Sequence, residues 1–159
     1  MTKKLLWIFF ISMLPIVEIR GAMVYASANN VPLLWGMLIG ILGNMLPVPF
    51  IFYLARKFLT WGKDQRYISK ICVFFLERGA AAGRKLTEKA GYGLYVALFV
   101  FVAIPLPGTG AWTGTFAASL LDMDFKKSVI AVMGGVVVAG LLIYAASIGL
   151  ISAWFAITT

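Results

Sequence analysis

The sequence predicts an all-α integral membrane protein, built as an inverted repeat. Each half would hold a re-entrant helical hairpin and one spanning helix, with an amphipathic cytoplasmic connector between the halves. Of the 159 residues, 62% are hydrophobic and 13% are charged, which is more apolar surface than a soluble domain of this size can bury. Two apolar runs are interrupted by proline, glycine or charge, and two others are uncharged and long enough to cross a membrane. We expect one transmembrane domain over residues 1–159, with repeats at 1–61 and 92–159 around a connector at 62–91.

The first interrupted segment begins near the N-terminus. Leu5–Val17 would form a half-helix of about 20 Å, which is shorter than a hydrocarbon core of about 30 Å. Pro15–Gly21 would break the helix, and Ala22–Ala28 would return to the same surface. Two alternatives stay open. The segment could span fully, which would place the N-terminal lysines inside, or it could be a signal peptide cleaved after residues 26–28.

A candidate spanning segment follows at Val31–Leu54, which carries no charge. Gly36, Gly40 and Asn44 recur every four residues, so they share one helix face on which another backbone could approach closely. Asn44 could hydrogen-bond across that contact, or it could be an ordinary satisfied asparagine. Pro47-Val-Pro49 would then kink or end the helix.

The connector is strongly basic. Residues 56–89 hold nine of the fourteen Lys and Arg residues, and such an excess beside membrane segments belongs in the cytoplasm. Its charge therefore predicts orientation and contact with anionic lipid rather than nucleic acid. Ile68, Ile71, Cys72 and Phe75 fall at helical spacing, which predicts an amphipathic helix at the interface.

The second interrupted segment consists of Leu94–Ile104 and Ala111–Leu121, separated by Pro105–Gly110. Each apolar run reaches only about 16 Å as a helix, roughly half of the hydrocarbon core. The prolines remove backbone donors, and the glycines permit unusual backbone angles. We expect a hairpin that enters from the cytoplasmic side, since Lys126 and Lys127 follow it. The alternative is one spanning helix with a proline kink.

The last segment, Ser128–Thr159, is uncharged and would cross once, with Ala131, Gly135 and Ala139 on a small-residue face. An odd number of crossings in each half would orient the halves oppositely, so that the two broken loops face each other near the midplane. The short match between residues 20–22 and residues 109–111 agrees with such a repeat.

Oligomerisation follows from the same reading. Broken hairpins at membrane depth need protein on every side to satisfy their backbone groups, and two spanning helices are too few to supply it. We predict a homodimer or a larger assembly. The close contact would lie at Gly36–Gly40 or at Ala131–Gly135–Ala139.

Glu18 and Arg20 are the charges that lie well inside an apolar context. Intramembrane charges are costly, and they pair with each other or face a cavity. Glu18 could couple to protons, and Arg20 could hold an anionic group such as a phosphate. They could instead form a local ion pair that only fixes the loop. Because histidine is absent and Cys72 is the single cysteine, we expect no metal, no disulfide and no other cofactor.

The second loop offers backbone amides, a hydroxyl, an aromatic ring and the N-terminus of the following helix, which favours anions. Trp112 could stack on a substrate or merely pack. No nucleophile–base pair, metal cluster or phosphate loop occurs in the sequence, so we do not expect an enzyme. The predicted substrate- or ion-binding residues are Glu18, Arg20, Gly21, Asn44, Pro105, Pro107, Gly108, Thr109, Gly110, Trp112 and Thr113.

Three motifs carry a family resemblance, and they are residues 15–22 (Pro-Ile-Val-Glu-Ile-Arg-Gly-Ala), residues 43–50 (Gly-Asn-Met-Leu-Pro-Val-Pro-Phe) and residues 104–114 (Ile-Pro-Leu-Pro-Gly-Thr-Gly-Ala-Trp-Thr-Gly). They resemble the signatures of the bacterial small multidrug export protein family, over nearly the whole chain. That family is similar to the DedA (VTT-domain) membrane proteins. This resemblance implies two opposed re-entrant hairpins and lipid movement, such as undecaprenyl phosphate translocation or phospholipid scrambling. It also implies that Glu18 corresponds to the DedA acidic residue.

The expected function is therefore transport or lipid flipping in the bacterial inner membrane by a multi-pass protein. The substrate would be a small amphipathic molecule or an anionic lipid, moved through a midplane site between the two loops, with protons as a possible coupling ion. The alternative is a non-transporting membrane protein for lipid organisation or assembly. In that case Glu18 and Arg20 would be structural.

Overall fold

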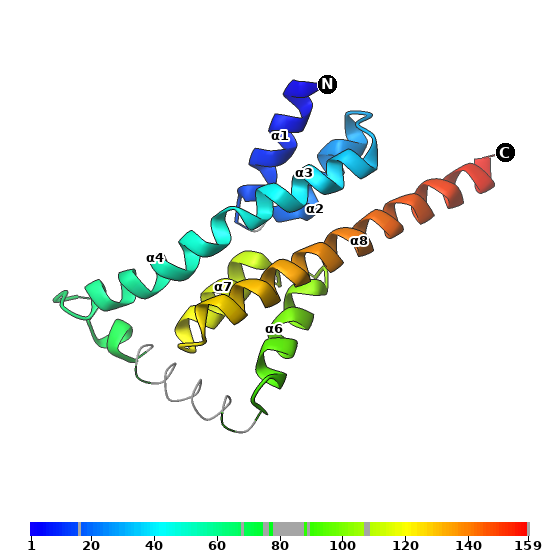
Figure 1. Ribbon diagram of the computed structural model, residues 1–159. Coiled ribbons are helices and arrows are strands. Elements are labelled where there is room, and N and C mark those ends of the chain that lie inside the picture. Colours follow the sequence, from blue (N-terminus) through cyan, green and yellow to red (C-terminus); the bar gives the residue numbers. More distant parts are fainter. Residues whose placement is uncertain are drawn as a thin grey trace.

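The fold is built from helices throughout the part of the chain that can be described. The computed structural model describes residues 1–15, 17–67, 69–74, 77, 88, 90–106 and 109–158, with side chains as far as Gly149. No strand occurs in these ranges, so the all-α prediction is confirmed for them. The helices (Figure 1) are α1 (Thr2–Met13), α2 (Glu18–Ala28), α3 (Leu33–Met45), α4 (Pro47–Gly62), α6 (Gly93–Ala103), α7 (Ala111–Leu120) and α8 (Phe125–Thr158).

Both interrupted segments break at the predicted prolines, but the first break is shorter than predicted, because α1 ends at Met13 and α2 already begins at Glu18, inside the predicted break Pro15–Gly21. Leu14, which follows α1, is extended with φ −72° and ψ 137°. Ile104, which follows α6, is extended in the same way with φ −75° and ψ 118°. Each precedes a proline, and a proline disfavours helical angles in the residue before it. The alternative of one kinked helix over residues 94–121 is therefore wrong, because α6 and α7 are separate helices.

The proline pair at Pro47 and Pro49 acts differently. Leu46 alone separates α3 from α4, and it keeps helical angles of φ −56° and ψ −45°. Pro47 opens α4 at the first position, where its missing N–H would have had no partner in the helix. The two helices therefore follow one another without a loop (Figure 1). Within the described residues, Leu33–Gly62 and Phe125–Gly149 are long and apolar enough to cross a membrane.

The small-residue faces pack inside the chain. A side chain at Gly36 would meet Ala26 of α2, 2.7 Å away, and one at Gly40 would meet Ile19 of α2, 3.3 Å away. Gly135 of α8 lies against α6 in the same manner. The sequence analysis predicts that these faces form a contact between subunits. The structure instead uses them to seat the short helices of the same chain, so the predicted homodimer has no support from these residues.

One glycine contact is repeated in the two halves. A Cβ atom at Gly43 of α3 would overlap the carbonyl oxygen of Phe9 in α1, and one at Gly135 of α8 would lie 2.8 Å from the carbonyl oxygen of Phe99 in α6. Phe9 and Phe99 stand at the same distance along the chain before Pro15 and Pro105. In the first half α3, and in the second half α8, therefore uses a glycine to approach the backbone of a short helix just before that helix breaks.

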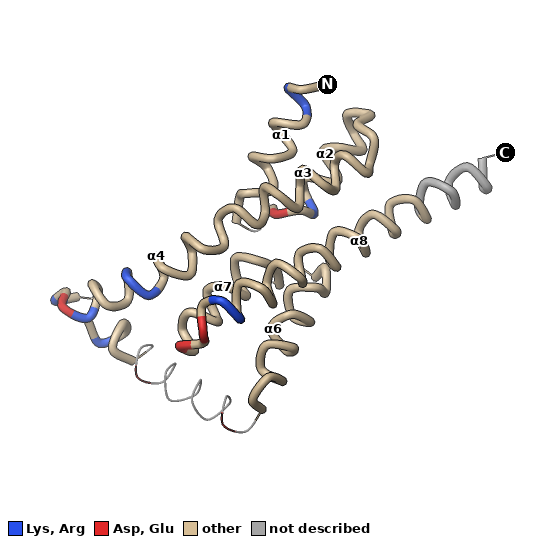
Figure 2. The backbone as a smooth tube through the Cα atoms, viewed as in Figure 1, with Lys and Arg blue, Asp and Glu red and all other residues tan. Residues whose placement is uncertain are grey.

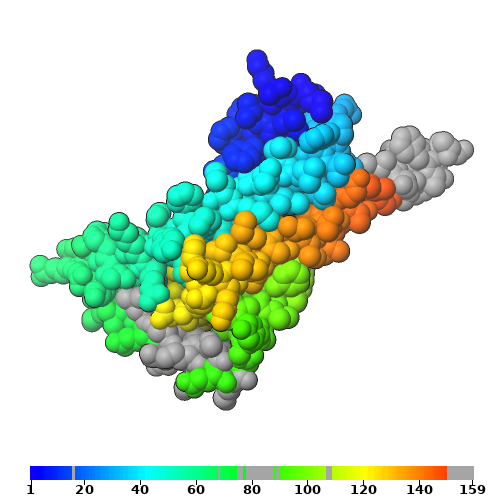
Figure 3. Space-filling view, in the orientation of Figure 1, coloured from blue at the N-terminus to red at the C-terminus, as the bar shows by residue number. Residues whose placement is uncertain are grey.

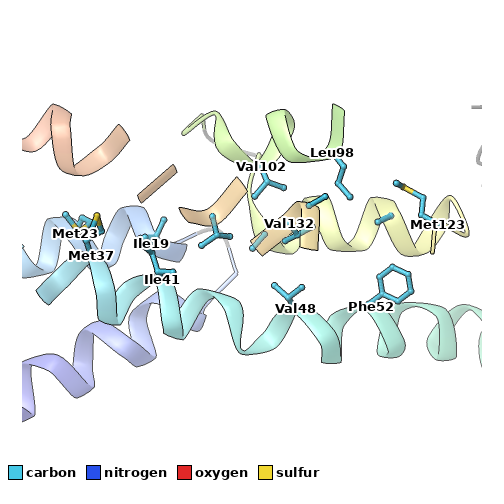
Figure 4. Close-up of a cluster of buried hydrophobic side chains, with 14 residues drawn as sticks. Ile19, Met23, Met37, Ile41, Val48, Phe52, Leu98, Val102, Met123 and Val132 are labelled. Carbon is cyan, nitrogen blue, oxygen red and sulfur yellow. The ribbon is translucent and has the colours of Figure 1, made fainter. Parts of the chain in front are cut away.

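The core joins the halves. The buried cluster includes side chains from α2, α3, α4, α6, α7 and α8, and Figure 4 shows Val48 and Phe52 on the face of α4 that is turned toward α7. Ser119 of α7 donates a hydrogen bond to the carbonyl oxygen of Phe52 (2.9 Å), and Asp122 forms an ion pair with Arg56. Residue 119 thus meets residue 52, and residue 122 meets residue 56, so the paired residue numbers increase in the same direction along both segments. The second half's α7 therefore lies parallel to the first half's α4, and Figure 3 shows the two segments in contact.

Apart from Glu18 and Arg20, the charged residues of the described chain are exposed at its surface. In Figure 2, basic residues gather at the far end of α4 and at the start of α8. Much of the predicted connector lies outside the described residues, including Ile68 and Phe75 of its predicted apolar face. Of that face, Cys72 is buried and Ile71 is 59% exposed.

Candidate functional site

Glu18 occupies an unusual backbone position at the start of α2. Its φ is 50°, in the left-handed region that costs a residue with a side chain about 1–3 kcal/mol. The residue is only 4% exposed although it bears a carboxyl group. Strained, buried acidic residues are uncommon, and they persist where surrounding structure holds them in place. The contacts of the carboxyl group show which groups hold Glu18 in this conformation.

The Glu18 carboxyl group lies at the N-terminus of α7. Its Oε1 accepts a hydrogen bond from the backbone N–H of Trp112, at 3.1 Å, which satisfies one of the free amides of that helix end. Gly110 makes the approach possible. A Cβ atom there would overlap the Glu18 carboxylate, and the φ of Gly110 is 145°, an angle that favours glycine.

Arg20 binds the other side of the same loop. Its Nη2 donates to the carbonyl oxygen of Thr109 at 2.6 Å and to the Thr109 hydroxyl oxygen at 3.1 Å. That hydroxyl lies 2.6 Å from the carbonyl oxygen of Ile104 and 2.8 Å from that of Leu106, so its proton closes the loop internally. The guanidinium group therefore holds a loop that is already shaped by its own threonine.

A third contact comes from the indole of Trp112. Its Nε1 donates to the carbonyl oxygen of Met13 at 3.1 Å, at the end of α1. The end of α1, the start of α2 and the start of α7 are thereby joined at one place. We call this set of contacts, made by Met13, Glu18, Arg20, Thr109 and Trp112, the loop junction.

The alternative prediction of a local ion pair between Glu18 and Arg20 is wrong. Within the described part of the chain, the ion pair found is that of Arg56 with Asp122. Because α2 begins at Glu18, Glu18 and Arg20 stand two residues apart on a helix, and such residues do not face each other. Each binds the second loop separately.

An apolar groove runs beside the loop junction, between α4 and α7. Its volume is about 810 Å³. Trp112 belongs to both places, because its indole N–H is in the loop junction while its side chain lines the groove. The residues that line the groove include Phe50, Leu54, Lys57, Phe58 and Trp61 from α4, and Trp112, Thr113 and Phe116 from α7.

The profile of one protein family, described as "Putative small multi-drug export protein", matches residues 18–142 of the chain. The chain belongs to this family. The match begins at Glu18. It includes every residue of the loop junction except Met13, and all residues that line the groove. No curated protein and no solved structure matches the chain. The name of the small multi-drug export family indicates a transporter-like role, and the name and the two apolar helices support association with a membrane.

The family match covers predicted site residues that lie outside the loop junction. Asn44 is buried on α3, where its Oδ1 has no hydrogen-bond partner. Pro105 is exposed, and Gly21 lies where a side chain would overlap Val17. Thr113 is exposed on the groove. The remaining two predicted residues, Pro107 and Gly108, lie outside the described residues.

Two features of the site were not predicted from the sequence. The Met13 carbonyl is a backbone group, and nothing in the residue type marks it. The groove on α4 arises from packing between the halves, but Phe50, Leu54, Phe58 and Trp61 recur at helical spacing and gave a signal for an apolar face. No three His, Cys, Asp or Glu side chains gather among the described residues to hold a metal.

Proposed function

We propose that this protein is a transporter of the bacterial inner membrane, which moves a small amphipathic molecule or an anionic lipid through the loop junction. One observation carries the proposal. Two charged side chains from one broken apolar segment, Glu18 and Arg20, bind the backbone of a second broken apolar segment. Charges in apolar surroundings mark substrate and ion pathways in membrane proteins.

The proposal places α1–α2 and α6–α7 in the membrane as re-entrant hairpins, with α3–α4 and α8 crossing it. Irregular backbone is tolerated at membrane depth only where protein covers it or water reaches it, and the loop junction gives both breaks such protein partners. The repeated contact of Gly43 with Phe9 and of Gly135 with Phe99 supports an internal repeat. Interrupted helices at matching positions of two halves favour a binding site between them.

In this mechanism, substrate and protons break the contacts of the loop junction. An anionic group on the substrate competes with the Thr109 carbonyl for Arg20, because a guanidinium binds an anion more strongly than a neutral carbonyl. A proton on Glu18 removes the charge that favours the N-terminus of α7. The freed amide of Trp112 can then bind the substrate's anionic group.

The test measures movement of a fluorescently labelled short-chain phosphatidylglycerol across liposomes that contain the purified protein. We expect Glu18→Gln to reduce the rate by about tenfold or more, since glutamine stays neutral and cannot restore the charge-assisted contact of about 1.5–3 kcal/mol that closes the junction again after each transport event. Glu88→Gln, an exposed acidic residue outside the junction, is the matched control and should keep the wild-type rate. A wild-type rate in Glu18→Gln would exclude the coupling role.

A second candidate is a non-transporting protein for lipid organisation or assembly. It is favoured by the fact that protein groups already bind both Glu18 and Arg20. Under this alternative, Arg20→Ala lowers the melting temperature while the wild-type protein itself shows no flux above protein-free liposomes. A melting curve beside the flux assay distinguishes the two candidates.

A further inference from the structure

The groove between α4 and α7 has the form of a site for one hydrocarbon chain. Ligand-binding pockets typically have volumes of about 300–1,000 Å³ and are lined by apolar and aromatic side chains with few polar groups. This groove has a volume of about 810 Å³. Phe50 and Phe58 line it from α4, and Phe116 lines it from α7. A polar or multiply charged ligand would find few partners along most of its length.

One end of the groove is cationic. Lys57 lines it and is exposed, and within the described chain it forms no ion pair or hydrogen bond. The neighbouring Arg56 is already paired with Asp122. Lys57 is therefore the cation that remains available to a ligand. An acidic headgroup complements it, whereas a purely zwitterionic headgroup gains less from one unpaired ammonium.

The distances along α4 fit one leaflet of a membrane. Leu33–Gly62 has 30 residues and is about 45 Å long, which exceeds a hydrocarbon core of about 30 Å and reaches into the headgroup layer. From Lys57 back to Pro47, the helix covers about 15 Å, or half of that core. Trp61 lies beyond Lys57, and tryptophan is enriched at the membrane interface.

We infer that the groove between α4 and α7 binds one acyl chain of an anionic phospholipid, with the lipid phosphate at Lys57 and the chain running toward Trp112. The site requires no transport activity, so it stands whether or not the loop junction moves a substrate. It places a resident anionic lipid beside the junction, with its headgroup in the layer where α4 ends.

The experiment uses the full chain in phosphatidylcholine nanodiscs that contain a small fraction of lipid with brominated acyl chains. Bromine quenches tryptophan, and Trp61 and Trp112 line the groove. We expect brominated phosphatidylglycerol to quench at about fivefold lower concentration than brominated phosphatidylcholine, the factor that one lysine near an anionic headgroup supplies. Lys57→Gln should abolish this preference. Lys63→Gln, an exposed lysine outside the groove, should retain it.

A second variant tests occupancy rather than charge. Ala55 lines the groove, so Ala55→Phe should weaken quenching by both lipids, whereas Leu38→Phe on an exposed face elsewhere should not. The inference is overturned if Lys57→Gln keeps the preference for phosphatidylglycerol, or if Ala55→Phe leaves quenching unchanged.

The other possible occupant is a second copy of the chain. In a Cys72→Ala background, Phe116→Cys would form a disulfide-linked dimer if two copies met at the groove. We expect this variant to stay monomeric on a non-reducing gel while brominated phosphatidylglycerol still quenches the wild type. Efficient cross-linking would assign the groove to a subunit interface and overturn the lipid site.

Discussion

The two broken segments end in the same way but contribute different chemistry to the loop junction. Each breaks before a proline, with an extended residue at Leu14 and at Ile104. The first segment then supplies two charged side chains, whereas the second supplies backbone groups, a threonine hydroxyl and an indole. The two segments therefore have similar backbone angles at their breaks but different side chains, and the charged side chains of the contact come from the first segment alone.

The halves also differ in how their second short helix packs. In the first half, α2 lies against α1 and α3 of its own half. In the second half, α7 packs on α4 of the other half as well as on α8 of its own, and it makes only a small contact with α6. This difference creates both the groove and the junction, because it brings the start of α7 to Glu18 instead of leaving it beside its own hairpin partner.

The strongest way to break the contact between the segments is a side chain at Gly110. Gly110→Ala combines a positive φ with overlap of the Glu18 carboxylate, and we expect it to lower the free energy of unfolding by about 3 kcal/mol. Thermal unfolding in detergent measures the change. Gly149→Ala is the control, since a Cβ there has nothing within 4 Å. Equal melting temperatures for the two variants would contradict the junction geometry.

The likeness of the halves is tested by their glycines. Gly43→Ala and Gly135→Ala should each cost about 1–3 kcal/mol, because each added methyl meets a backbone carbonyl of a packed helix. We expect similar losses in a parallel unfolding titration. A large loss at one position and none at the other would mean that the repeated contact is not structurally equivalent.

A smaller change removes one side of the junction. Trp112→Phe deletes the hydrogen bond from Nε1 to the Met13 carbonyl and should cost about 1 kcal/mol. Trp61→Phe, which lines the groove but has no such bond, should cost less. Melting temperatures of the two variants, measured in the same detergent, give the comparison. A greater loss for Trp61→Phe would refute a stabilising role for the indole bond.

The smallest effect is expected at the far end of the α4–α7 contact. Arg56 and Asp122 form an ion pair whose side chains are 54% and 44% exposed, and such pairs contribute about 0–1 kcal/mol. A double-mutant cycle with Arg56→Gln and Asp122→Asn should give a coupling energy in that range, and it should decrease in high salt. A coupling that salt leaves unchanged would indicate that the pair is shielded from solvent.

Much of the fold could be predicted because its determinants are local. Pro15 and Pro105 act on their immediate neighbours, so the breaks follow from the sequence alone. The contact between the loops, and Glu18 and Arg20 as its charged members, also followed from placing unusual residues in apolar runs. The re-entrant placement, the inverted orientation and the homodimer stay predictions, since they depend on a membrane or on a second chain.

The rest depended on contacts between distant segments. Periodicity could not show that α7 packs on α4, because an apolar face does not specify its partner. Nor could residue type show that the Thr109 hydroxyl closes its own loop instead of facing a ligand. The alternative of a local Glu18–Arg20 ion pair failed for a local reason, namely that α2 starts earlier than the break in the apolar pattern suggests.

The packing of α7 on α4 has a consequence for biogenesis. Synthesis completes α4 well before α7, because some fifty residues separate the end of one from the start of the other. Until residue 120 leaves the ribosome, the face of α4 that carries Val48 and Phe52 lacks its native partner, and the Glu18 carboxyl lacks the amide of Trp112. The N-terminal half therefore cannot mature as an independent unit during translation, although domains generally fold in order of synthesis. These contacts of the N-terminal half can form only after the C-terminal half has been synthesised.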